Sequence, residues 1–85
     1  MTDQQIIELI NSSLAEEFEY QGGMTPETSL FEEMGLDSLD VVDLVIVLET
    51  AFDMKIREEE AIRSIRTLGD IHKFVIAKKR QTESA

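Results

Sequence analysis

The stretch from Gly35 to Leu39 holds the residues best suited to chemistry. It reads Gly-Leu-Asp-Ser-Leu, so Ser38 follows a glycine that can turn the chain and precedes a long apolar run. A hydroxyl at such a corner is expected to be exposed and so available for chemistry. The same pattern also fits a plain helix start with Asp37 or Ser38 as the cap. The spacing by itself leaves both interpretations open.

The residues that would let this chain activate its own serine are lacking. A serine nucleophile needs a base beside it, and a cysteine mechanism needs a thiol. The sequence has no Cys, and its single histidine, His72, lies far along the chain at a position that we interpret as surface. We therefore expect no catalytic residues and no enzyme activity.

Charge is distributed unevenly along the chain. There are 18 acidic and 8 basic residues, for a net charge of -10, and residues 1–54 contain 13 of the acids and none of the bases. Such a field repels nucleic acid and anionic membranes, and it attracts basic protein surfaces. We expect basic protein partners, no nucleic acid and no membrane.

The acid content also raises the possibility of a calcium-binding helical protein. An EF-hand needs an Asp-x-Asp-x-Asp-Gly loop with Glu at its twelfth position, and no segment fits that pattern. We therefore expect no metal site. Dense acidic stretches such as Glu16, Glu17 and Glu19, or Asp37 with its acidic neighbours, would at most collect divalent ions weakly.

The elements that must position Ser38 are predicted to be helices. Apolar residues at helical spacing indicate a first helix over about residues 3–19, with Thr2 and Gln5 as a capping box and Gly22-Gly23 as the stop. These apolar residues are Ile6, Ile7, Ile10, Leu14 and Phe18.

Residues 21–37 do not continue this helical spacing and are predicted to form a long loop, which Leu30 and Phe31 pin to the core.

Residues 38–52 contain no Gly or Pro, and their acids break the strict alternation of a strand, so a helix is predicted there. Its expected core face consists of Val41, Leu44, Val45, Leu48 and Phe52. Its remaining surface mixes apolar and polar residues, namely Leu39, Val42, Ile46 and Val47 with Asp40, Asp43 and Thr50. That mixture suits docking of basic, partly apolar partner surfaces, and a wholly buried central helix is the alternative.

Two more helices complete the prediction. A short one over residues 58–64 lacks a clear cap at Arg57 and is expected to point Ala61, Ile62 and Ile65 inward. The last helix begins with a second capping box, Thr67 to Asp70, and carries basic residues near its negative end. No sheet is expected, so the fold class is all-α, a small bundle of three longer helices plus one short helix.

The length of 85 residues allows one domain, over residues 1–80, with residues 81–85 as a frayed C-terminal tail. No stretch approaches the roughly 18 consecutive apolar residues that a membrane span needs, and no basic segment leads an apolar run at the start. We expect a monomeric, cytoplasmic protein.

Leu36-Asp37-Ser38-Leu39 is preceded by Phe31-x-x-Met34-Gly35 and followed by Asp40-x-x-Asp43-Leu44 and Glu49-x-x-Phe52. In this order, with the acidic first helix, the long loop and the start of the last helix at Thr67-Leu68-Gly69-Asp70, the sequence resembles the free-standing acyl carrier proteins over nearly its whole length. A bare Asp-Ser-Leu triplet is a weak signal, but the full order is specific.

This resemblance implies that Ser38 receives 4'-phosphopantetheine from coenzyme A and that the arm carries acyl groups as thioesters in fatty acid or polyketide-type biosynthesis. The phosphate would then lie at a helix N-terminus, whose free N–H groups favour an anion, although Asp37 and Asp40 would repel it. Covalent attachment would make that repulsion tolerable. The resemblance further implies a phosphopantetheinyl transferase and acyl-transferring or condensing enzymes with basic surfaces as partners. They would contact Asp37, Leu39, Asp40, Asp43 and Ile46. The interior would open to shelter an acyl chain among Val45, Leu48, Phe52, Ile62 and Ile71, although an ordinary packed core explains those residues equally well.

Two other interpretations remain at this point. An aminoacyl or peptidyl carrier shares the arm and the bundle, but it commonly has Gly-Gly-His or Gly-Gly-Asp before the serine, where this chain has Leu36-Asp37. An acidic helical adaptor without a prosthetic group would use the exposed apolar strip and would not need the Ser38 hydroxyl.

Overall fold

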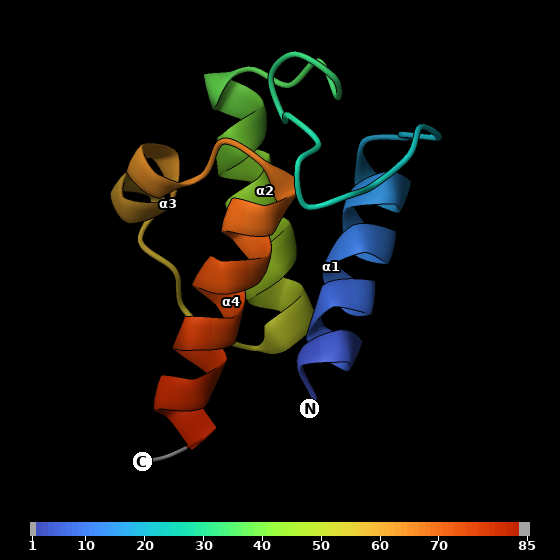
Figure 1. Cartoon of the computed structure of the whole chain (residues 1–85). Helices are drawn as coiled ribbons and strands as arrows, with labels where there is room; N and C mark the ends of the chain where they lie inside the picture. The colour runs from blue at the N-terminus through green and yellow to red at the C-terminus, as the bar shows by residue number, and fades with distance from the viewer. Residues whose placement is uncertain (1, 84–85) are drawn as a thin grey trace.

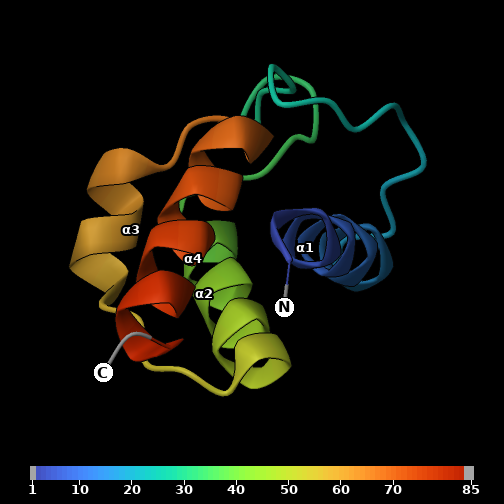
Figure 2. The ribbon, with the colours of Figure 1, turned by 60° about the horizontal axis from the view of Figure 1, so that its bottom comes forward.

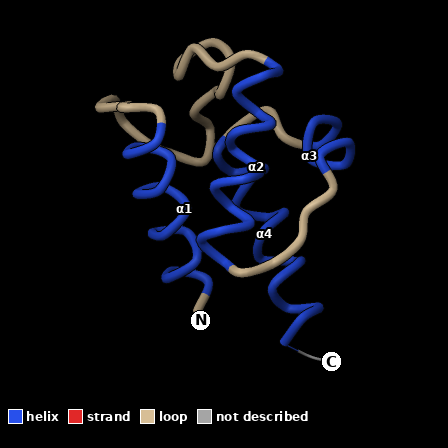
Figure 3. The backbone as a smooth tube through the Cα atoms, turned by 180° about the vertical axis from the view of Figure 1, so that it is seen from behind, coloured by secondary structure: helices blue, strands red, loops and turns tan. Residues whose placement is uncertain are grey.

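The computed structural model describes residues 2–83 and contains four helices within that range (Figure 1). They are α1 (Asp3–Glu17), α2 (Ser38–Phe52), α3 (Glu58–Ser64) and α4 (Leu68–Glu83). The part of the chain described has no strand (Figure 3), and Ser29 and Thr67 form one isolated antiparallel bridge. The predicted all-α class is confirmed.

Local sequence signals account for most helix boundaries. At α1, the Thr2 hydroxyl accepts from the backbone N–H of Gln5, and the Gln5 amide oxygen accepts from Thr2 N–H, so the expected capping box is present. The Thr67 and Asp70 side chains form the corresponding pair at the start of α4. The first helix ends at Glu17, two residues before the predicted end, and Glu19 takes a left-handed φ of 52°.

The four helices pack into one bundle (Figures 2 and 3). α1 lies against α2 and α4, and α3 lies against α2 and α4 on the other side. α1 runs antiparallel to α2, so the C-terminal end of α1 lies at the same end of the bundle as the N-terminus of α2 (Figure 1). This places Ser38 at one tip of the bundle, beside the long loop.

The core forms where the apolar faces meet. All five residues of the predicted α2 core face are buried: Val41, Leu44, Val45, Leu48 and Phe52. Leu44, Val45, Leu48 and Phe52 share one core cluster with Ile6, Ile10 and Leu14 of α1 and with Leu68, Ile71 and Val75 of α4. Because these residues recur at helical spacing, one side of α2 is fixed inward and the opposite side must face outward.

α3 follows the prediction in its bounds but not in all of its contacts. Arg57 stands at the N-cap without a side-chain hydrogen bond, as expected. Ala61 and Ile65 are buried, whereas Ile62 is 39% exposed, so the prediction that Ile62 points inward is wrong. A helix of two turns offers the core only one narrow stripe, and Ile62 lies outside it.

The loop between α1 and α2 is tied to the start of α4. Leu30 is buried and its N–H donates to the Arg66 carbonyl over 3.0 Å, while Leu68 N–H donates to the Thr28 carbonyl over 3.0 Å. Phe31 does not pin the loop to the core, because it is 37% exposed and lies under the Arg66 guanidinium, 6.0 Å from the ring centre. Of these two residues, only Leu30 therefore anchors the loop to the core.

At the C-terminal end, α4 runs through residues 81–83, which were expected to belong to the tail, and residues 84 and 85 lie outside the described residues. Across residues 2–83, no helix combines the length and the apolar character that crossing a bilayer requires.

Candidate functional site

The corner before α2 is built by two aspartates. Asp37 is the N-cap, and its Oδ1 accepts from the N–H groups of Leu39 and Asp40, each over 3.0 Å. In return, Asp37 N–H donates to Oδ2 of Asp40 over 3.0 Å, which completes a reciprocal capping box. Gly35 has a φ of +71°, a left-handed value that brings the chain into this cap.

Ser38 is the first residue of α2 and is exposed. Because Asp37 does the capping, the Ser38 hydroxyl forms no hydrogen bond within residues 2–83. The sequence allowed either Asp37 or Ser38 to cap the helix, and the structure shows that Asp37 is the cap. The hydroxyl of Ser38 is accessible for a covalent group.

The backbone at this corner offers less to an anion than expected. Two of the first N–H groups of α2, those of Leu39 and Asp40, already donate to Asp37. The carboxylates of Asp37 and Asp40 also stand beside Ser38 and repel a phosphate. The expected help from free N–H groups is therefore largely absent, so the corner fits a phosphate held by a covalent bond rather than by hydrogen bonds.

The predicted partner residues divide into two sets. Leu39 and Ile46 are 76% and 52% exposed, and Asp43 is exposed as well. At about 100° per residue, these three lie within roughly 60° of one another on α2, opposite the core face. Asp37 and Asp40 lie at the tip, where both hold the cap, and Asp40 is half-buried.

The capping role of Asp40 was missed from the sequence. The usual capping box has Glu or Gln at its third helical position, and this one has Asp. The three-residue spacing from Asp37 to Asp40 was the available signal.

His72 is not a surface residue, contrary to the prediction. It is only 6% exposed, and its Nε2 lies 2.8 Å from Oδ1 of Asn11 in α1. An oxygen acceptor at that distance requires Nε2 to carry the proton. Burial lowers the pKa of His72 below 6.5, since desolvation disfavours the charged ring. The histidine joins α1 to α4 and does not serve the Ser38 corner.

Among the residues proposed to line an acyl-sheltering interior, Val45, Leu48, Phe52 and Ile71 are buried and Ile62 is not. Within the described part of the chain, no three acidic or histidine side chains converge in a way that could hold a metal ion.

Comparison with known proteins agrees with this geometry. Residues 5–75 match the family described as "Phosphopantetheine attachment site". The chain is 40% identical to an acyl carrier protein of Prochlorococcus marinus (strain MIT 9515), over 93% of this chain and 99% of that protein. It is 44% identical to acyl carrier protein 2 of Ralstonia nicotianae, over 84% of this chain and 88% of the relative. It is 41% identical to an acyl carrier protein of Syntrophobacter fumaroxidans, over 88% of each. The chain belongs to the acyl carrier protein family.

Proposed function

We propose that Ser38 is the attachment point of 4'-phosphopantetheine and that the chain carries acyl intermediates in fatty acid or polyketide-type biosynthesis. The observation that supports this most directly is the exposed Ser38 hydroxyl at the tip of α2, which no neighbour engages within residues 2–83. A helix start that needed only a cap is already satisfied by Asp37. When attached, the group supplies a thiol that holds acyl groups as thioesters.

Attachment forms a bond from Ser38 Oγ to the phosphorus that carries the pantetheine and breaks the bond from that phosphorus to the bridging oxygen of the coenzyme A pyrophosphate. Adenosine 3',5'-bisphosphate leaves, and a base must take the proton of the Ser38 hydroxyl. The side chains near the corner are not placed for that task, because the carboxylates of Asp37 and Asp40 are bound to backbone N–H groups. His72 is buried in the bundle with its Nε2 on Asn11. We propose that the transferase supplies the base and that this chain is its substrate.

The partner surface that we propose starts at the tip and continues down α2. Asp37 and Asp43 supply negative charge, and Leu39 and Ile46 supply exposed apolar contacts. Asp40 adds charge but acts mainly on the cap. An exposed charge pair contributes only about 0 to 1 kcal/mol, so docking would be weak and salt-sensitive, which suits a carrier that must change partners.

The remaining proposals concern the bounds of the domain, its oligomeric state and its cargo. We infer that residues 1–80 make up the carrier domain and that it acts as a monomer. Between acyl and aminoacyl cargo, the similarity to proteins named acyl carrier proteins supports acyl groups.

The decisive experiment is the intact mass of the protein before and after incubation with coenzyme A and a broad-specificity phosphopantetheinyl transferase. We expect a gain of one phosphopantetheine in the wild type and none in Ser38→Ala. The matched control is Ser12→Ala, which removes an exposed α1 hydroxyl and should leave loading unchanged. Loading of Ser38→Ala, or no loading of the wild type, would contradict the proposal.

A further inference from the structure

Arg66 lies between α3 and α4 and joins α3 to the loop that leads to Ser38. Its Nη1 donates to the carbonyls of Ile62 and Ile65 at the C-terminal end of α3, over 2.7 and 2.9 Å. The same guanidinium lies over the ring of Phe31, 6.0 Å from the ring centre. One side chain from outside the helix therefore holds the end of α3.

The backbone of Arg66 is fixed by contacts that do not involve its side chain. Its N–H donates to Oδ2 of Asp70 over 3.0 Å, and its carbonyl accepts from the N–H of Leu30 over 3.0 Å. Asp70 belongs to α4, and Leu30 is buried in the core. A substitution that removes only the guanidinium therefore leaves the support of Arg66 in place.

α3 has few other attachments to the bundle. It has seven residues, and a helix of two turns is not stable by itself. Among the α3 side chains that the structure describes, only that of Ala61 is buried. Arg57 gives the helix no side-chain cap, and the ion pair of Glu60 with Lys78 is accessible to solvent. An element held this weakly can open while the rest of the protein stays folded.

α3 packs against the side of α2 on which Ser38 lies. At about 100° per residue, four residues of α2 fall within roughly 60° of one another, namely Ser38, Val45, Glu49 and Phe52. Glu49 marks the side of α3, because its Oε2 accepts from the N–H of Ile56, just before α3, over 3.0 Å. Val45 and Phe52 are buried, so the apolar interior begins where α3 covers α2.

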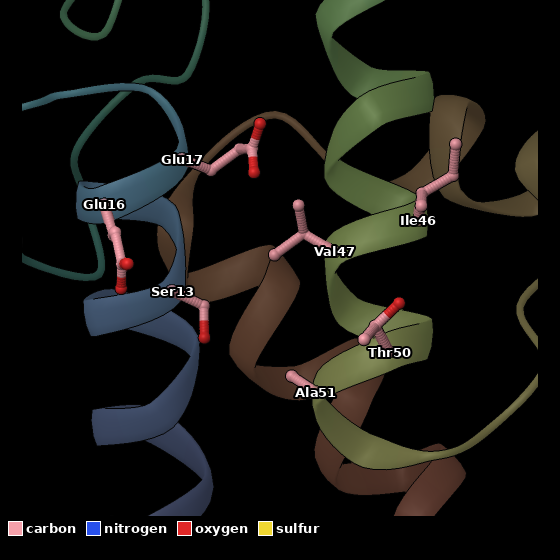
Figure 4. Close-up of a pocket in the computed structure, with 7 residues that line it drawn as sticks. All are labelled: Ser13, Glu16, Glu17, Ile46, Val47, Thr50 and Ala51. Carbon is pink, nitrogen blue, oxygen red and sulfur yellow. The ribbon is translucent and has the colours of Figure 1, made fainter.

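The open groove between α1 and α2 lies on a different side of α2 (Figure 4). It has a volume of about 560 Å³, and Val47 and Ala51 extend across it towards α1. Both residues lie roughly 140 to 180° around α2 from Ser38. Between them and Ser38 runs the exposed line of α2, which consists of Leu39, Asp43 and Ile46. A group attached to Ser38 therefore starts on the side of α3 and not at this groove.

We propose that Arg66 is a tether that holds α3 closed over α2 and so controls the access of cargo on Ser38 to the interior. With α3 in place Val45 and Phe52 are covered, so an acyl chain reaches them only when α3 moves outward. That movement breaks the two hydrogen bonds of the Arg66 guanidinium, which therefore set how often the interior opens. The part of this inference that concerns cargo rests on the proposed function, whereas the tether itself does not.

The first test measures amide hydrogen exchange by NMR in the protein without its arm. The reporters are the N–H groups of Ala61 and Ile65, which donate to the carbonyls of Arg57 and Ala61. In the wild type we expect them to exchange at least about tenfold faster than amides in the middle of α2, with little dependence on dilute urea, because α3 opens without the rest of the bundle. Equal rates in α3 and α2 would overturn the separate opening of α3.

Arg66→Met removes the guanidinium and keeps an apolar side chain beside Phe31. The matched control, Arg63→Met, removes the same charge from an exposed α3 residue that takes no part in these contacts. We expect the exchange of the Ala61 and Ile65 amides to rise about 3- to 20-fold in Arg66→Met and less than about twofold in the control. Arg66→Lys, which can replace part of the bonding, should fall between the wild type and Arg66→Met. Equal effects of the two Met variants would overturn the tether.

The second test uses protein loaded with octanoyl-phosphopantetheine and measures the rate at which hydroxylamine takes the acyl group and releases the thiol. Arg66→Met should slow this cleavage about two- to tenfold, because an α3 that opens more readily admits the chain and shields the thioester. Arg63→Met should match the wild type. Unchanged or faster cleavage in Arg66→Met would overturn the control of cargo access. A wild type that cannot be loaded would contradict the proposed function instead, and the mass measurement shows that result before this test begins.

Discussion

Asp37 and Ser38 are adjacent, yet the structure gives them separate tasks. Asp37 satisfies two backbone N–H groups of α2, and Asp40 satisfies the N–H of Asp37. Ser38 contributes nothing to the cap, so its hydroxyl is left for the attachment that we propose. Stability and function are therefore separable at this corner by single substitutions.

We predict that Asp37→Ala lowers the free energy of unfolding by about 0.5 to 2 kcal/mol, the usual cost of losing an N-cap side chain. Ser38→Ala should leave it unchanged or slightly raised, because Ala is the better helix former and no hydrogen bond is lost. Urea unfolding monitored by circular dichroism measures both. A Ser38→Ala protein as destabilised as Asp37→Ala would show that the serine hydroxyl supports the helix after all.

The pair of His72 and Asn11 joins residues 61 positions apart. The pKa of His72 determines how the stability of the protein changes with pH. Burial lowers this pKa in the folded state below the unfolded value of about 6.5. The folded protein therefore favours the neutral ring. The neutral His72 ring therefore contributes fully to stability above about pH 6.5. This contribution is lost as the pH falls through the lower pKa of the folded state.

We therefore predict that the wild type loses stability between about pH 7.5 and pH 5.5 in excess of His72→Gln, whose side chain does not titrate. The Gln variant can still reach Asn11, so its curve supplies the background from all the carboxylates. The measurement is the urea midpoint across this pH range. Parallel curves for the two proteins would show that protonation of His72 is not coupled to folding.

At the scale of elements, the helices were predictable and several of their contacts were not. The apolar period of α2 fixed its core face, and the spacing of Thr2 to Gln5 and of Thr67 to Asp70 fixed two helix starts. Phe31 was misplaced because its hydrophobicity does not reveal that Arg66 covers its ring. Local patterns show which side of a helix is apolar, but they do not show which neighbour is available to cover a given side chain.

The exposed line on α2 leads to a prediction about docking. Asp43 is exposed and holds no cap, so Asp43→Lys changes the partner surface without disturbing the start of the helix. We expect kcat/KM for loading by a transferase to fall about fivefold or more at low salt, with a thermal midpoint that does not fall. Glu27→Lys, at an exposed loop residue, is the control for net charge. Equal effects of the two variants would argue against a specific role for this face.

The start of α4 clamps the loop that leads to Ser38. Gly69 N–H donates to the Pro26 carbonyl over 2.9 Å, and a Cβ at Gly69 would lie 2.8 Å from the same oxygen. We predict that Gly69→Ala destabilises the protein by about 1 to 3 kcal/mol, because backbone must move to admit the methyl group. Gly23→Ala is the control, since nothing lies within 4 Å of its added Cβ. Equal thermal midpoints for the two variants would refute the clamp.

For the molecule as a whole, the unequal charge distribution was evident from the sequence, but its consequences depend on the fold. The basic residues lie in the second part of the chain, and among the residues that the structure describes Arg80 reaches Asp3 and Lys78 reaches Glu60. The bridge of Ser29 with Thr67 likewise joins distant segments. Contacts of this kind depend on how helices are arranged in space, which a single sequence does not specify.

Self-repulsion should therefore limit the stability of this protein. The 13 acids of residues 1–54 have no base in their own segment, so folding brings like charges together. We predict that the thermal midpoint rises as sodium chloride goes from about 0.02 to 0.3 M, and rises further with millimolar magnesium, because screening weakens this repulsion. Salt also weakens the pairs Arg80–Asp3 and Lys78–Glu60, but pairs this accessible to solvent contribute only about 0 to 1 kcal/mol each, so we expect the repulsion to dominate. Glu8→Gln with Glu27→Gln should reduce the rise, since two of the repelling charges are gone. A midpoint that fell with salt would mean that the ion pairs outweigh the repulsion.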